Sequence, residues 1–360
     1  MSTAIFENRQ SNLKAVLAKQ ELDGILITRL SNVRYICGFT GSAGSCLITP
    51  KGDYFITDGR YMEQSKEEVK GFERVIGYGT HIEIAQKNNL IPSGLKLALE
   101  SDFLSLSLYN QVIELFPNTK WESTKMILEN LAEVKDESEL EALRTAVEIT
   151  DKVFEEVLQF FKIGISEKDI ALELAMRYRK YGDGEAFPSI VASGPNSALP
   201  HAQPGKRKLK QGDFVVVDAA AKYAGYHADM TRTVVIGNPT DKHHEIYELV
   251  KKSQQAGIDT AKAGVTCKAV DDATRNVIAD AGYGDNYIHS AGHGIGLEIH
   301  TYLRLSQQSE EILKENNVVT IEPGVYLTGW GGVRIEDDIV VKKDGNEVLN
   351  KTSKDLMVLN

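Results

Sequence analysis

The first third of the chain alternates helical stripes with short apolar runs. Leu13, Val16 and Leu17 have the spacing of one helix face, and a turn signal follows at Asp23-Gly24. Residues 25–27, 46–48 and 53–57 are short, mainly apolar runs typical of strands. This alternation predicts a mixed α/β domain.

A different pattern begins near residue 134 and predicts long helices. Apolar residues recur every three or four positions from Leu140 to Phe161, which indicates one buried helix face. Ser166 and Asp169 resemble a capping box that opens the next helix, and Gly182 would end it. We therefore expect two domains, residues 1–130 and 131–360.

The second domain becomes rich in strands after its helices. Residues 215–217 and 318–321 are apolar, β-branched runs, and we expect both to form buried strands. The fold class predicted for the whole chain is an α/β N-terminal domain followed by an α+β C-terminal domain.

Composition and charge narrow the function classes. The net charge of −10 argues against a broad surface for nucleic acid or for an anionic membrane. No stretch of about 18 consecutive apolar residues exists, and the N-terminus lacks the pattern of a signal peptide. The three cysteines have no metal-ligand spacing and fit a reducing compartment. We expect a cytoplasmic protein that binds neither membrane nor nucleic acid.

Two pairs of acidic residues stand at the ends of predicted buried strands. Asp218 ends the first strand, and Asp229 follows eleven residues later. A hairpin turn at Gly225 would bring the two opposite each other. Glu322 and Glu336 repeat this arrangement fourteen residues apart, around a glycine-rich segment. One acid alone would be typical of a solvated strand end, but two such pairs favour a shared role.

Metal binding is the simplest explanation of facing carboxylates, because like charges across two strands destabilise a hairpin unless they are neutralised. His293 is flanked by Gly292 and Gly294, which leave room for an imidazole to approach a metal. Four carboxylates and one imidazole suit two divalent ions about 3.5–4 Å apart. This oxygen-rich set favours Mn²⁺, with Co²⁺, Fe²⁺ or Zn²⁺ as alternatives.

These motifs together resemble the pita-bread metallopeptidases, the family of aminopeptidase P, prolidase and methionine aminopeptidase. The resemblance rests on Asp218, on Asp229-Met-Thr-Arg-Thr, on Gly-His293-Gly-Ile-Gly, on Ile-Glu322-Pro-Gly and on Val-Arg-Ile-Glu336-Asp. Residues 32–42 and 57–61 look like the extra N-terminal creatinase-like domain of the proline-specific branch. The resemblance implies a pita-bread C-terminal catalytic domain. It also implies a homodimer in which the N-terminal domain takes part in dimerisation and borders a neighbour's active site.

The resemblance also implies roles for individual residues. Asp218 would bind one metal, His293 and Glu322 the other, and Asp229 and Glu336 would bridge the two. His201 and His300 match the family's histidines near the substrate. Two metals would lower the pKa of a bridging water, and Glu322 would pass a proton to the leaving proline nitrogen.

Two arginines are weaker candidates. Arg304 would bind the C-terminal carboxylate of a dipeptide, although a solvated arginine after a strand is an equal alternative. Arg334 would orient the ligating carboxylates. After His300, where the family often has Glu and then Pro, this chain has Thr301 and Leu303. This departure suggests a change in the pocket beyond the scissile bond.

The leading functional hypothesis is an Xaa-Pro aminopeptidase that acts on peptides with proline in the second position. The nearest alternative is an Xaa-Pro dipeptidase, or prolidase. A creatinase-type amidinohydrolase and a non-catalytic binding module fit less well, because all five metal positions are retained.

Overall fold

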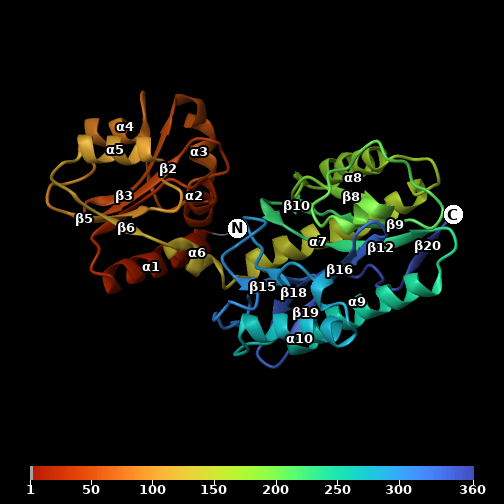
Figure 1. Ribbon diagram of the computed structural model, residues 1–360. Helices are drawn as coiled ribbons and strands as arrows, with labels where there is room; N and C mark the ends of the chain where they lie inside the picture. Colours follow the sequence, from red (N-terminus) through yellow and green to blue (C-terminus); the bar gives the residue numbers. More distant parts are fainter. Residues whose placement is uncertain (1–2) are drawn as a thin grey trace. The chain divides into compact units, whose positions relative to one another are not determined.

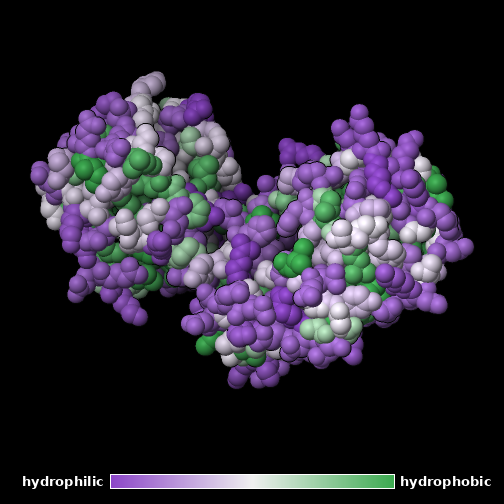
Figure 2. All heavy atoms as spheres, viewed as in Figure 1, coloured by the Kyte–Doolittle hydropathy of each residue, from purple (hydrophilic) through white to green (hydrophobic). Residues whose placement is uncertain are grey.

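The computed structural model describes residues 3–360, and the chain divides into two compact units with a boundary between Ala132 and Glu133. Figure 1 shows the elements of each unit. Hydrophilic residues cover most of the visible face of the C-terminal unit (Figure 2). No described helix is both long and apolar enough to cross a bilayer.

The N-terminal unit is built on a six-stranded mixed sheet (Figure 1). Its central strand has Ile25, Leu26 and Ile27 fully buried, and it runs antiparallel to one neighbour and parallel to the other. The predicted runs 25–27, 46–48 and 53–57 all lie in this sheet. In spatial order the strands are β4 (Glu73–Gly77), β3 (Gly52–Asp58), β2 (Ser45–Thr49), β1 (Gly24–Ile27), β5 (Lys96–Glu100) and β6 (Lys120–Thr124).

Helices pack against this sheet. Ile82, Ile84 and Val112 from two of the helices join the buried side chains of the strands in one core cluster. Leu13 and Leu17 of the first helix are also buried, as their spacing predicts. The helical elements are α1 (Thr3–Lys19), α2 (Leu30–Cys37), η1 (Gly59–Tyr61), α3 (Met62–Glu68), α4 (His81–Lys87), α5 (Leu106–Leu115) and α6 (Ile127–Ala132).

Two pairs of packed helices belong to the C-terminal unit. The second helix opens with the predicted capping box, in which the Ser166 and Asp169 side chains each accept a hydrogen bond from the other's backbone N–H. The first helix of this unit ends at Val157, and a short 3-10 turn continues to Phe160. The helices are α7 (Glu137–Val157), η2 (Leu158–Phe160), α8 (Glu167–Tyr181), η3 (Gly194–Ala198), α9 (Asp241–Thr260), α10 (Cys267–Asp280) and η4 (Gly284–Asn286).

The strands of this unit form several small sheets. One has the order β20 (Met357–Leu359), β12 (Thr231–Ile236), β9 (Phe214–Asp218) and β8 (Ile190–Ser193), and a second has β11 (Tyr226–His227), β10 (Ala221–Tyr223) and β7 (Gly184–Glu185). A third has β15 (Val318–Ile321), β18 (Asp337–Val341) and β19 (Asn346–Val348). The two remaining pairs are β13 (Gly292–His293) with β14 (Arg304–Leu305), and β16 (Gly324–Leu327) with β17 (Gly331–Arg334).

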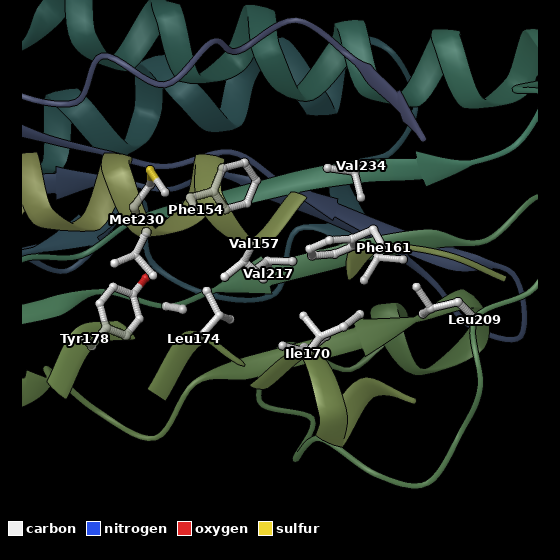
Figure 3. Close-up of a cluster of buried hydrophobic side chains, with 14 of the residues drawn as sticks. Phe154, Val157, Phe161, Ile170, Leu174, Tyr178, Leu209, Val217, Met230 and Val234 are labelled. Atoms are coloured by element: carbon white, nitrogen blue, oxygen red, sulfur yellow. The ribbon is translucent and has the colours of Figure 1, made fainter. Parts of the chain in front are cut away.

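A large apolar cluster fixes helices α7 and α8 against strands β9 and β12. Figure 3 shows Phe154 and Val157 of α7 and Leu174 of α8 near Val217 and Val234 of the strands. Because these side chains are almost fully buried, the strand ends that they support are held in place.

Candidate metal centre

Nine residues singled out from the sequence line one pocket of about 240 Å³ in the C-terminal unit. They come from segments more than a hundred residues apart in the chain. They are His201, Asp218, Asp229, His293, His300, Arg304, Glu322, Arg334 and Glu336.

Strand pairing brings the four carboxylates to this pocket. Strands β15 and β18 pair Ile321 with Asp337, so Glu322 and Glu336 lie at the next position of the same hairpin. The pairing of β9 with β12 places Asp218 opposite Thr231. The expectation that Asp218 and Asp229 face each other directly is therefore wrong by two residues.

The turn between β10 and β11 explains this register. Ala224 and Gly225 have φ angles of 47° and 78°, and they form a two-residue turn that pairs Tyr223 with Tyr226. Counting outward from this turn fixes the partner of Asp218 two residues beyond Asp229. Asp229 still lines the pocket, where it lies between β11 and β12.

His293 lies among these acids at the end of the short strand β13. Its Nε2 is 3.5 Å from Asp229 Oδ2 and 3.5 Å from Glu322 Oε1. Gly292 is required beside it, because a Cβ there would lie 2.0 Å from the carbonyl oxygen of Thr320. Burial and the neighbouring His300 lower the pKa of His293 to about 3. Its imidazole is therefore neutral, which is the form that binds metals.

The carboxylates are crowded and short of partners. Burial and the other acids raise the pKa values of Asp229 and Glu336 well above their usual range, and burial raises that of Glu322 to about 7. Within residues 3–360, Asp218 Oδ1, Asp229 Oδ1 and Glu336 Oε1 are buried without a hydrogen-bond partner. Buried oxygens of this kind need a hydrogen-bond donor, a proton or a cation.

These residues fit divalent metal ions. Asp229, His293 and Glu336 each offer one ligand atom, and these three atoms lie within 4.8 Å of one another. The surplus carboxylate oxygens and the neutral imidazole are the donors that such ions take.

Arg334 contacts the acidic cluster directly. Its Nη2 donates to Asp218 Oδ2 over 2.6 Å, and its Nε donates to Thr231 Oγ1 over 3.0 Å. Thr231 Oγ1 in turn donates to Glu336 Oε2 over 2.6 Å. One guanidinium therefore fixes two of the acids, one directly and one through a hydroxyl group.

Three polar side chains of the wall hold different places in the pocket. His300 has its ring 4.3 Å from that of His293, and burial and Arg304 lower its pKa. His201 lies on an exposed turn after η3. Arg304 lies opposite His293 in the backbone pairing of strands β13 and β14.

Two residues that bind Arg334 and Asp229 were not predicted from the sequence. Tyr326 receives a hydrogen bond from Arg334 Nη1 over 2.9 Å, and its hydroxyl lies 2.9 Å from His289 Nε2. Asp338 Oδ2 accepts the backbone N–H of Asp229 over 2.9 Å. Tyr326 stands in an apolar strand and gives no signal, whereas Asp338 was visible in the sequence as the third acid of the run Glu336-Asp337-Asp338.

The fold and the pocket define a two-domain metallopeptidase. A model of the Creatinase/Prolidase N-terminal domain matches residues 9–134, and a model of metallopeptidase family M24 matches residues 141–343. The chain belongs to metallopeptidase family M24, in its proline-specific branch, with a pita-bread C-terminal domain.

Relatives carry two related names. The Xaa-Pro dipeptidase from Bacillus anthracis superimposes with a TM-score of 0.94 at 41% identity, covering 98% of this chain and 100% of that one. The X-Pro aminopeptidase from Thermotoga maritima gives a TM-score of 0.89 at 38% identity, covering 94% and 98%. The Xaa-Pro dipeptidase of Pyrococcus horikoshii is 34% identical over 360 residues, covering 98% of this chain and 99% of its own length.

Proposed function

We propose that this protein is a metal-dependent Xaa-Pro dipeptidase. The observation that carries this proposal is Arg304, an exposed cation in the wall of a pocket whose other charges are mostly acidic. No carboxylate of residues 3–360 forms an ion pair with its guanidinium. A free guanidinium at this place suits the C-terminal carboxylate of a dipeptide.

The relatives favour the same choice. The sequence alone ranked an aminopeptidase first and a dipeptidase second, whereas relatives named Xaa-Pro dipeptidases are the more frequent among the similar proteins described. Support for the aminopeptidase comes from the Thermotoga relative at 38% identity. A peptidase is common to both readings.

The acidic cluster would hold two divalent ions, with Asp218, Asp229, His293, Glu322 and Glu336 as ligands. Bound there, the ions would supply Lewis acidity to the scissile peptide group, and Mn²⁺ remains our first choice.

Protein side chains would do the remaining work. Glu322 would take a proton from the water that attacks the scissile carbonyl, and would deliver it to the prolyl nitrogen as that nitrogen leaves. His300 and His201 would donate hydrogen bonds to the scissile carbonyl oxygen, which gains negative charge. Because the Xaa-Pro amide lacks an N–H, recognition has to rely on the two ends of the substrate and on the carbonyl group.

The test compares three substrates with Mn²⁺ and with EDTA: Ala-Pro, Ala-Pro amide and Ala-Pro-Ala-Ala. We expect Ala-Pro to be cleaved best, and EDTA to abolish cleavage. Arg304→Ala should reduce kcat/KM for Ala-Pro about 10- to 100-fold, because a hydrogen-bonded ion pair is worth about 1.5–3 kcal/mol. The same substitution should leave the slow cleavage of the amide unchanged, since the amide has no carboxylate.

Three results would contradict parts of the proposal. Equal cleavage of Ala-Pro-Ala-Ala and Ala-Pro would make the protein an aminopeptidase. Equal losses for acid and amide in Arg304→Ala would remove Arg304 as the carboxylate anchor. Inactivity of the metal-loaded protein on all three substrates would refute the proline-specific reading.

A further inference from the structure

A loop between β8 and the segment before β9 presents His201 to the pocket. It starts at Ser193, forms η3, and turns at residues 199–202, where the N–H of Ala202 donates to the carbonyl of Leu199 over 3.1 Å. His201 itself is exposed. Its position therefore depends on how the loop is held rather than on close packing of its ring.

Both ends of this loop bind the same carboxylate. Glu167 Oε1 accepts hydrogen bonds from Ser193 N over 2.8 Å, from Ser193 Oγ over 2.7 Å and from Asn196 Nδ2 over 3.0 Å. Glu167 Oε2 accepts the N–H of Gly205 over 3.1 Å. One side chain thus ties residue 193 to residue 205, on either side of His201.

Glu167 is a fully buried acid without an ion pair among the described residues. The nearby Arg207 instead forms a bidentate pair with Asp213, at 2.6 and 2.9 Å, and donates to Ser193 Oγ over 2.6 Å. Burying a carboxylate is costly unless hydrogen bonds satisfy it. The loop provides those bonds, so the loop and the carboxylate stabilise each other.

Capping of its own helix does not explain Glu167. The capping box of α8 is complete with Ser166 and Asp169. As the first residue of the helix, Glu167 gains only the favourable electrostatics of an N-terminal acid. The apolar face of α8, including Ile170 and Leu174, is locked into the buried cluster of Figure 3. Glu167 is therefore a fixed point to which the loop attaches.

The inner part of the loop meets the metal centre. Arg334 Nη1 donates to the carbonyl oxygen of Pro200 over 3.3 Å, and the N–H of Gly332 donates to Ser197 Oγ over 2.8 Å. These two contacts hold the loop at residues 197 and 200, and Glu167 holds it at residues 193, 196 and 205. In the chain, His201 directly follows Pro200 and precedes the attachment at Gly205.

We propose that Glu167 is a positioning residue for the reaction: its carboxylate fixes both ends of the loop that carries His201. This inference rests on the proposed function of the same pocket. Glu167 lies outside the pocket wall and acts through His201. A small displacement of a group that contacts substrate can reduce the rate by up to about 100-fold.

The experiment is a double-mutant cycle on the Mn²⁺-loaded full-length protein with Ala-Pro as substrate. Glu167→Gln replaces an acceptor with an NH₂ group that faces other donors. We expect kcat/KM to fall about 10-fold or more in the wild-type background and less than about 2-fold in His201→Ala. Asn196→Ala, which removes one donor and leaves Ser193 and Gly205 bound to the carboxylate, should show a smaller effect with the same dependence on His201.

Asp151→Asn is the matched control. Asp151 is also a buried acid, and it accepts Lys351 N and Thr352 Oγ1, each over 2.7 Å, away from the loop. We expect it to lower the melting temperature as Glu167→Gln does, but to change kcat/KM less than about 2-fold. Two results would overturn the proposal. One is that Glu167→Gln and Asn196→Ala reduce activity equally with and without His201. The other is that Asp151→Asn loses as much activity as Glu167→Gln.

Hydrogen exchange without substrate separates this inference from the proposed function. The amides of residues 193–205 should exchange faster in Glu167→Gln and stay protected in Asp151→Asn. If the wild-type protein cleaves no Xaa-Pro peptide, the proposed function fails, and exchange alone decides whether Glu167 holds the loop. Unchanged exchange in Glu167→Gln would refute the positioning role even in an active enzyme.

Discussion

Removing metal should make the stability of this protein fall as the pH rises from about 5 to 8. Asp229, Glu322 and Glu336 have pKa values raised by burial and by one another, so the metal-free folded state binds protons that the unfolded state has already lost. Stability rises with pH only where the unfolded state binds more protons. Here the folded state binds more protons, so stability falls as the pH rises.

Glu322 sets the scale of the effect. Its pKa rises from 4.5 to about 7, a change of about 2.5. Because one pKa unit corresponds to about 1.4 kcal/mol, the folded state loses about 3 kcal/mol of stability by pH 8. For a unit of this size about 3 kcal/mol corresponds to roughly 6–12 °C in melting temperature. Bound cations would remove this loss, so stabilisation by Mn²⁺ should be larger at pH 8 than at pH 5.5.

The assay is thermal unfolding of EDTA-treated, dialysed protein across this pH range, with and without Mn²⁺. Glu322→Gln should flatten the curve of the metal-free protein. Glu347→Gln is the control: hydrogen bonding to Arg144 lowers the pKa of Glu347, so this acid stays ionised throughout the range and its loss should not change the slope. A metal-free protein equally stable at pH 5.5 and 8, with an identical curve for Glu322→Gln, would refute the reasoning.

Two further substitutions separate the metal centre from the core. Arg334→Lys removes the fork that reaches Asp218, Thr231 and Tyr326, and it should weaken Mn²⁺ binding about 10- to 100-fold by titration calorimetry; unchanged affinity would contradict its role. Leu174→Ala in the buried cluster should lower the free energy of unfolding by about 2–5 kcal/mol in urea, without altering the affinity for Mn²⁺. A loss of both would mean that the cluster and the centre are coupled.

The sequence predicted which residues meet in the pocket better than it predicted how they pair. Asp218 and Glu322 each follow an apolar, β-branched run, and burial of such a run forces the acid at its end to the edge of the core. Both runs are buried strands, and both acids line the pocket. The register was partly wrong because the turn at Ala224 and Gly225, rather than the spacing of the acids, decides which residues pair.

Supporting residues were harder to find, for a physical reason. Glu167 looks like an ordinary acid in the first turn of a helix, and Tyr326 looks like part of an apolar strand. Their roles depend on partners far away in the chain, such as Gly205 for Glu167 and His289 for Tyr326. Local periodicity carries no information about such contacts.

The two acid pairs become one site because the hairpins that carry them are hydrogen-bonded to each other. Glu336 N donates to Thr231 O over 3.1 Å, and Thr233 Oγ1 donates to Arg334 O over 2.9 Å. With the bond from Asp229 N to Asp338, these contacts join each acid-bearing segment to the other hairpin at several points. The carboxylates cannot move apart to relieve their repulsion unless these buried bonds break. The fold therefore holds the acids at close range, and cations relieve the repulsion that this arrangement creates.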